Sequence, residues 1–232
     1  MNRLAPWRLV SSLAAATLVA AVPASVASRT DAWRTIKLSE LCVSEGHVTQ
    51  GRDGMLSVDD TKMRAIVPAP AAGIEARFNY LGPTAETSAL GSGAVRRQFG
   101  LKLRAQDPCN LVYAMWRFEP KPEIVVQVKS NPGEHESSAC GNNGYVTVRP
   151  DQVSPVEAPA VGVPHRLAAT VRGTALQVQV DGATAWQGDL GAAPVAAGGE
   201  VGVRSDNVRL ALSLSAPLPD TGLGACPTGP QD

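Results

Sequence analysis

The sequence lacks an excess of charge of either sign, because its 232 residues include 21 basic and 21 acidic side chains. Proteins that bind nucleic acid through its phosphate backbone depend on a surplus of lysine and arginine. The balanced composition therefore predicts that nucleic acid is not a partner of this protein.

Long hydrophobic runs are also scarce. The one extended apolar run, at residues 9–22, is shorter than the ~20 residues that a membrane-spanning helix needs. It follows Arg3 and Arg8 and precedes a small-residue stretch at 25–27, as in a cleaved export signal. We therefore expect residues 1–27 to be a signal peptide and the protein to be secreted, either extracellular or periplasmic, with no membrane span. The alternative is an uncleaved N-terminal anchor.

The charge that is present is unevenly spread. Loss of the signal leaves 19 basic and 21 acidic residues, a net charge of −2. Segment 95–130 carries seven basic and three acidic residues, whereas the chain from residue 131 onward carries five basic and ten acidic ones. Segment 95–130 is thus a basic island on an acidic protein, and it is either a binding surface or ordinary solvated charge.

No stretch of the chain shows a helical period longer than about two turns. Apolar residues instead take alternate positions in segments 74–80, 99–104, 167–171, 176–180 and 208–214. Strands with one apolar and one polar face belong to antiparallel sheets, and two such sheets bury their apolar faces by packing together. We therefore predict an all-β fold, an antiparallel β-sandwich over residues 28–216, with a closed barrel as the alternative.

The four cysteines, Cys42, Cys109, Cys140 and Cys226, include no Cys-x-x-Cys pair, which argues against a zinc site. In an exported chain, four cysteines indicate disulfide bonds, for which three pairings are possible. We favour Cys109–Cys140, which would pin the loop after a hairpin. Cys42–Cys226 would then tie the Pro- and Gly-rich tail at 217–232 to the N-terminal part of the domain.

A run in the C-terminal half marks a known fold. His165 opens a strand that leads through Gly173 to the sequence V-Q-V-D-G at 178–182, and G-V-R follows at 202–204. These residues resemble the closing strands of concanavalin A-like lectin/glucanase and laminin G-like jelly rolls. The resemblance implies a jelly roll and favours carbohydrate binding. It does not fix the activity, because that superfamily includes lectins, laminin G modules and glycosidases.

Motifs of enzymes of this superfamily are missing. Its retaining glycosidases commonly carry two carboxylates in a Glu-x-Asp-x-x-Glu strand, and no such spacing occurs here. Glu134 and Glu136 flank His135 in a loop-like stretch and are the alternative catalytic pair. A Gly-x-Ser-x-Gly nucleophile motif and a phosphate-binding glycine loop are also absent.

Calcium is the cofactor that the resemblance makes worth considering, because jelly-roll lectins often use it. Asp206 with Asn207, and Asp107 with Asn110, offer oxygen ligands, but such pairs more often form turns. We expect no cofactor, with calcium as the alternative.

Outward side chains of the central strands form the candidate ligand-binding site. Strands at 74–80, 99–104, 111–118 and 124–129 would place these side chains next to one another if the strands are neighbours. Arginine and lysine bind carboxylate or sulfate groups, and aromatic rings stack on sugars. Trp116 is a further aromatic candidate unless it belongs to the core. The predicted ligand-binding residues are Arg77, Lys102, Arg104, Tyr113, Arg117, Gln127, Lys129 and Tyr145.

We therefore expect a secreted, non-catalytic, lectin-like domain that binds a carbohydrate or another anionic cell-surface polymer. The alternatives are a secreted glycoside hydrolase with an unrecognised carboxylate pair, and a structural or adhesive envelope protein. A lectin should show a shallow groove, a hydrolase two converging carboxylates, and an adhesive protein an exposed apolar patch.

Overall fold

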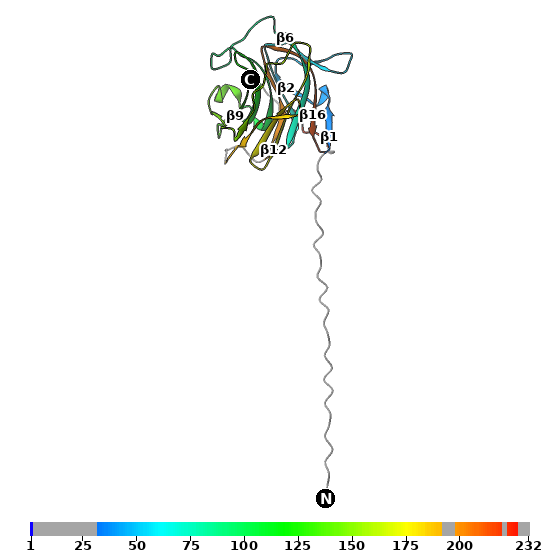
Figure 1. Cartoon of the computed structure of the whole chain (residues 1–232), viewed down its shortest axis with the longest axis vertical. Coiled ribbons are helices and arrows are strands. Elements are labelled where there is room, and N and C mark those ends of the chain that lie inside the picture. Colours follow the sequence, from blue (N-terminus) through cyan, green and yellow to red (C-terminus); the bar gives the residue numbers. More distant parts are fainter. Residues whose placement is uncertain (2–31, 192–197, 220–221, 227–232) are drawn as a thin grey trace.

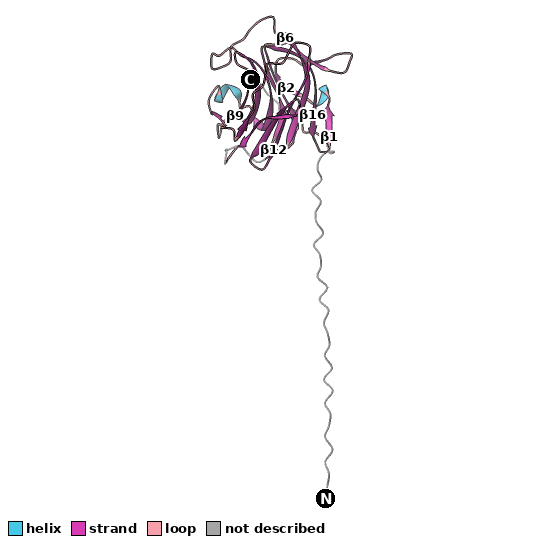
Figure 2. Ribbon diagram, viewed as in Figure 1, coloured by secondary structure: helices cyan, strands magenta, loops and turns pink. Residues whose placement is uncertain are grey.

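In a computed structural model, which describes residues 1, 32–191, 198–219 and 222–226, the chain folds into two stacked antiparallel sheets (Figure 1). Strands dominate the described part of the chain, and its helical turns are short and peripheral (Figure 2). The predicted all-β sandwich is confirmed. The predicted signal peptide, apart from Met1, lies outside the described residues.

One sheet has nine strands. From edge to edge it contains β11 (Gln152–Val153), β14 (Ala183–Asp189), β13 (Ala175–Val180), β12 (Pro164–Arg172), β6 (Gly73–Pro83), β16 (Val208–Pro217), β4 (Leu56–Val58) and β3 (Thr49–Gln50). The ninth strand, β1 (Trp33–Ile36), pairs with the C-terminal part of β16.

The other sheet has seven strands. From edge to edge it contains β10 (Tyr145–Thr147), β9 (Glu123–Lys129), β8 (Asn110–Glu119), β7 (Arg97–Asp107), β15 (Glu200–Asp206), β5 (Lys62–Pro70) and β2 (Cys42–Glu45). The described helical segments are η1 (Leu38–Glu40), between β1 and β2, and α1 (Ser137–Cys140), between β9 and β10. No helix within the described ranges is long and apolar enough to cross a membrane.

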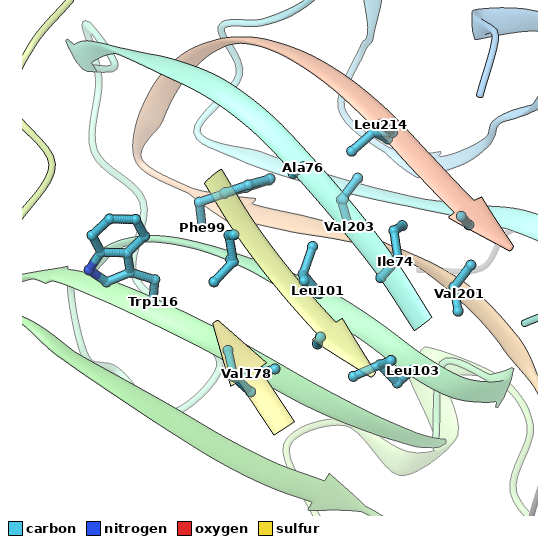
Figure 3. Packing of buried hydrophobic residues seen from close by; sticks show 14 of the residues in the cluster. Ile74, Ala76, Phe99, Leu101, Leu103, Trp116, Val178, Val201, Val203 and Leu214 are labelled. Carbon is cyan, nitrogen blue, oxygen red and sulfur yellow. The ribbon is translucent and has the colours of Figure 1, made fainter. Parts of the chain in front are cut away.

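Period-two alternation builds the core between the sheets. Ile74 and Ala76 of β6 point toward Leu101 of β7 and Val203 of β15 (Figure 3), and all four are fully buried. Trp116 also lies in this core. Each fully buried valine, leucine or isoleucine side chain contributes about 1.5–3 kcal/mol relative to exposure. The stacked sheets therefore have a stable inner layer, and the outward positions of β7, β8 and β15 are left for other uses.

Two disulfides tie the loops and the tail to the sandwich. Cys42 of β2 is bonded to Cys226, and Cys109, in the turn from β7 to β8, is bonded to Cys140 of α1. This is the pairing that we favour from the sequence. The second bond fixes the loop at 130–144 against the end of the seven-stranded sheet, next to the candidate site.

Candidate functional site

A hollow of about 610 Å³, which we call the groove, lies on the outer face of the seven-stranded sheet. All seven strands contribute to its floor, and its walls are parts of the loops at 84–96 and 130–144. The charged residues that line the groove are Glu45, Lys62, Arg64, Arg96, Lys102, Lys129 and Arg204. Six of these seven residues are basic, so the groove is suited to an anionic ligand.

The same alternation of side chains along each strand that fills the core also places the groove residues on the outer face of the sheet. On β7, Leu101 faces the other sheet and Lys102 faces the groove. On β15, Val203 is in the core and the next residue, Arg204, faces the groove. Tyr113 lies opposite Lys102 in the register of β7 and β8 and also lines the groove. Most of the basic surface is therefore built on strands, and only Arg96 comes from a loop.

Asp206 forms the centre of an ion cluster beneath the groove. Its fully buried carboxylate accepts hydrogen bonds from Arg64 Nη2 at 2.6 Å, Gln98 Nε2 at 2.7 Å and Arg204 Nε at 2.9 Å. Burial alone would raise its pKa, but the charges of Arg204 and Arg64, helped by the glutamine hydrogen bond, lower the pKa to about 2. Asp206 is therefore ionised at neutral pH and orients both guanidinium groups.

Arg204 also reaches an aromatic ring on the groove floor. Its guanidinium carbon lies 5.1 Å from the ring centroid of Tyr113, a cation–π distance. Burial raises the pKa of Tyr113 to about 12 although the charge of Arg204 acts against this rise. The phenol is therefore neutral at pH 7, and the floor combines a fixed cation with a neutral aromatic ring.

Gly100 makes the contact between Arg204 and Tyr113 possible. In the strand register it lies between Arg204 of β15 and Met115 of β8, and it has no side chain to block the arginine from crossing β7. A Cβ atom at Gly100 would lie 2.6 Å from the carbonyl oxygen of Ala114 and 2.8 Å from Cα of Met115. The close approach of the two strands therefore requires glycine here.

Replacement of Gly100 by alanine should lower the free energy of unfolding by about 1–3 kcal/mol, because the added methyl group overpacks a backbone contact. Denaturation by urea measures this change. Gly198→Ala is the matched control, because a Cβ atom there meets no atom within 4 Å. Equal stability of the Gly100→Ala variant and the control would contradict this account of the groove floor.

Lys129, at the end of β9, supports the wall of the groove that the loop at 130–144 forms. Its ammonium group donates hydrogen bonds to the carbonyl oxygens of Gly141 at 2.9 Å and Pro108 at 3.1 Å, and lies 5.3 Å from the ring centroid of Tyr145. The residue is only 3% exposed, and burial lowers its pKa, as does the charge of Arg204. Lys129 therefore holds the loop in place and adds positive charge behind the groove surface.

No family model matches the chain, and no curated protein matches its sequence. Solved structures do match. The carbohydrate binding module CBM66 from Bacillus subtilis superposes with a TM-score of 0.51 at 12% identity, covering 75% of this chain and 91% of the module. The Emp46p carbohydrate recognition domain in its metal-free form gives a TM-score of 0.49 at 14% identity, covering 77% of this chain and 88% of that domain.

The chain has the concanavalin A-like jelly-roll fold. The resemblance of its C-terminal half to that superfamily is thus confirmed at the level of the fold. A putative glycosyl hydrolase from Parabacteroides distasonis ATCC 8503 also matches, with a TM-score of 0.48 at 11% identity, covering 79% of this chain and 98% of that one. Since identities this low show the fold alone, the function of this concanavalin A-like sandwich must be argued from the groove.

The concanavalin A-like sandwich brings most of the predicted ligand-binding residues together. The predicted residues that line the groove are Lys102, Tyr113, Gln127, Lys129 and Tyr145. They come from β7, β8, β9 and β10, which are consecutive neighbours in the seven-stranded sheet. The prediction that the strands at 99–104, 111–118 and 124–129 lie side by side is therefore correct.

Three predicted residues do not line the groove. Arg77 is on β6 of the opposite sheet, so its predicted position beside β7 is wrong. Arg104 has a φ of 51° where the register of β7 and β8 shifts, and its Nη2 donates to the carbonyl oxygen of Gly173 instead. Arg117 forms a salt bridge with Glu123 at 2.7 Å at the far end of β8. Trp116, the further aromatic candidate, is in the core.

Sequence reasoning missed much of the positive charge of the groove. The missed basic residues are Lys62, Arg64, Arg96 and Arg204. The sequence M-R-A at 63–65 alternates in the same way as the strands that were predicted, and therefore signalled an outward Arg64. Arg96 comes from a loop, where no periodicity could place it.

The two residue pairs considered for calcium are occupied by other partners. Asp206 is held by two guanidinium groups, and Asn207 hydrogen-bonds the backbone of Ser88 and Arg96. Asp107 accepts hydrogen bonds from the Cys109 amide and the Asn110 side chain. Across the described ranges, no three side chains of His, Cys, Asp or Glu gather in a metal-binding arrangement.

Proposed function

We propose that the groove binds an acidic carbohydrate and does not cleave it. The observation that carries this proposal is the excess of basic over acidic residues in the groove lining, six against one. Carboxylate and sulfate groups of glycans are bound well by arginine and lysine. The fold similarity to a carbohydrate binding module is consistent with this ligand class.

Neutral groups of the groove suit the uncharged parts of a sugar. Tyr113 and Tyr145 stack on each other with ring centroids 6.1 Å apart, and Gln127 lies beside them in the register of β8 and β9. Aromatic rings pack against the apolar faces of pyranose rings, and amide groups bind hydroxyls. Tyr113 is only 5% exposed and its ring already contacts Arg204 and Tyr145. In this corner of the groove, formed by β8, β9 and β10, Tyr145 and the amide of Gln127 can therefore contact a sugar ring while the basic residues bind its acidic group.

The arrangement of carboxylates favours binding over hydrolysis. Glycoside hydrolysis commonly needs two carboxyl groups about 5–10 Å apart on either side of the bond that breaks. The described groove lining offers one carboxylate, that of Glu45, which lies 3.6 Å from Arg64 Nε. Asp206 is beneath the floor and is committed to three donors. Glu134 and Glu136, the alternative catalytic pair, are not part of the lining.

Secretion is part of the proposal. The two disulfides are compatible with an extracellular or periplasmic location, where such bonds persist. An acidic polymer of a cell surface or of the extracellular medium would be accessible there. Mass spectrometry of the exported protein should find an N-terminus at residue 28, and an intact N-terminus would favour the anchor alternative.

A glycan array on the purified mature protein tests the ligand class. We expect retention of acidic glycans that carry uronate or sulfate groups, and little retention of their neutral counterparts. Preference for neutral glycans would contradict the proposal.

Binding should not require calcium. The carboxylate best placed under the groove, that of Asp206, is neutralised by Arg64 and Arg204, and a divalent cation beside these guanidinium groups would be repelled. We therefore expect the same array pattern in the presence of EDTA and of added calcium. Loss of binding in EDTA would show that a metal site takes part.

A further inference from the structure

Two loops from opposite ends of the seven-stranded sheet meet over the groove. The loop at 84–96 leads into the start of β7, and the loop at 130–144 leaves the end of β9. Since β7 and β9 are both antiparallel to β8, these two points lie at opposite ends of the strands. Both loops nevertheless line the groove, and a Cβ atom on Gly91 would lie 3.4 Å from Cβ of Asn142. We call this meeting of Gly91 and Asn142 the arch.

The first side of the arch is fixed by a buried asparagine. Asn207, which is 1% exposed, donates from Nδ2 to the carbonyl oxygens of Ser88 at 2.8 Å and Arg96 at 2.9 Å. Its Oδ1 accepts a hydrogen bond from the Ser88 amide at 2.8 Å. Both ends of the loop segment 88–96 are thus hydrogen-bonded to the side chain of Asn207, which directly follows β15, and Gly91 lies between these two ends.

The second side of the arch is fixed by covalent and polar contacts. The Cys109–Cys140 bond ties α1 to the turn between β7 and β8, and Lys129 binds the carbonyl oxygen of Gly141, next to Asn142. Asn131 donates from Nδ2 to the carbonyl oxygens of Cys109 and Asn143. This side is therefore held in place by contacts on both flanks of Asn142.

From this geometry we propose that the groove takes its ligand end first, so that it recognises the terminal units of an acidic glycan. The proposal rests on the proposed function, because it concerns the same groove. A polymer can dock sideways into an open groove at any point along its length, but a groove spanned by a fixed arch blocks that approach. A chain end can still pass beneath the arch and reach Arg204 and Tyr113 on the floor.

The arch can be locked without filling the groove. The Cβ separation of 3.4 Å at positions 91 and 142 is close to the ~3.5–4.5 Å of natural disulfides, and Gly91 does not have a positive φ. The double variant Gly91→Cys/Asn142→Cys should therefore form a bond across the arch when oxidised and release it on mild reduction. Asn142→Cys alone, treated in the same way, is the control. The native Cys109 and Cys140 are fully buried and thus shielded from a mild reductant, whereas Cys226 is exposed, so the Asn142→Cys control also reports any effect of reducing the Cys42–Cys226 bond.

The probes are polygalacturonate and chondroitin sulfate, each as a hexasaccharide and as polymers of increasing length. Calorimetry gives the Kd for the hexasaccharide, and light scattering gives the number of proteins bound per polymer chain. We expect the oxidised double variant to bind a hexasaccharide within about threefold of the Kd of its reduced form. We also expect the number of wild-type protein molecules bound per polymer chain to stay the same as the polymer length increases.

Two results would overturn end-first recognition while leaving the proposed function intact. One is loss of hexasaccharide binding on oxidation with recovery on reduction, which would mean that the arch must open. The other is a number of bound proteins that rises with polymer length, which would mean that internal units are bound. If wild type binds none of the probes in any form, the proposed function fails, and end-first recognition fails with it.

Discussion

Asp206→Asn is expected to lower the free energy of unfolding by about 3–5 kcal/mol, because it removes the counter-ion of the largely buried Arg204 guanidinium and leaves that of Arg64 with Glu45 alone, at 3.6 Å. The side chains of Arg64 and Arg204 are 12% and 13% exposed, so water compensates little of the lost charge. The amide of asparagine keeps the size of the side chain, which separates loss of charge from loss of packing. Equilibrium unfolding in guanidinium chloride measures the effect.

Glu119→Gln is the matched control for this variant. It removes the same charge from an ion pair with Arg97 in which the glutamate side chain is 54% exposed. Exposed ion pairs contribute about 0–1 kcal/mol, so this control should stay close to wild type. Equal losses in the two variants would show that the cluster beneath the groove does not have the structural role assigned to it.

The stability loss in Asp206→Asn should depend on pH. The pKa of Asp206 is lowered from its ordinary 3.8 to about 2 in the folded protein, so its charge stabilises the fold above about pH 4. That contribution is lost as the pH falls from about 4 toward 2, where the folded protein takes up the proton. The stability difference between wild type and Asp206→Asn should therefore be largest at neutral pH and shrink across this window.

Neutralisation of two groove cations, Lys62→Gln together with Arg96→Gln, should weaken binding to acidic polysaccharide by about 10- to 100-fold. These two residues form no ion pair with any other described residue, so their charge is available to a ligand. Burial lowers the pKa of Arg96, as does the positive charge of Arg117. A bound anion would offset this repulsion between the two guanidinium groups. Affinity electrophoresis in an acidic polysaccharide gel measures the loss.

Arg52→Gln with Arg172→Gln is the control for net charge, because both residues are exposed and neither lines the groove. This control should keep the affinity of wild type within a factor of about two. If the control weakens binding as much as the groove variant, attraction depends on overall charge and the groove is not the site. Unfolding curves of both variants should match wild type, since Arg52 and Arg172 are exposed and Lys62 and Arg96 are partly exposed and form no ion pair with another described residue.

The sandwich could be predicted from the sequence because each strand shows its own pattern of alternating apolar and polar residues. Alternation in β6, β7, β12, β13 and β16 marks each apolar face, and the sequence V-Q-V-D-G at 178–182 marks one hairpin. Which strands are neighbours is set by contacts between segments far apart in the chain. The strand at 74–80 was therefore assigned to the wrong sheet, and Arg77 with it.

The groove could be predicted only in part. Lys102 and Tyr113 follow from alternation on strands that are consecutive in the sequence. The Arg64–Asp206–Arg204 cluster joins β5 to β15, which are separated by most of the domain, and the arch depends on loop conformations that follow no period. Arg104 was misplaced because a positive φ turns it from the groove toward Gly173.

The most direct test is calorimetric titration of the mature protein with polygalacturonate and with the same polymer after chemical reduction of its carboxyl groups to alcohols. The two polymers share their sugar rings and linkages and differ in charge. We predict binding to the acidic polymer, weakened by added salt, and a loss of at least about tenfold with the reduced polymer. Equal affinity for the two polymers would contradict recognition of acidic groups by the basic groove.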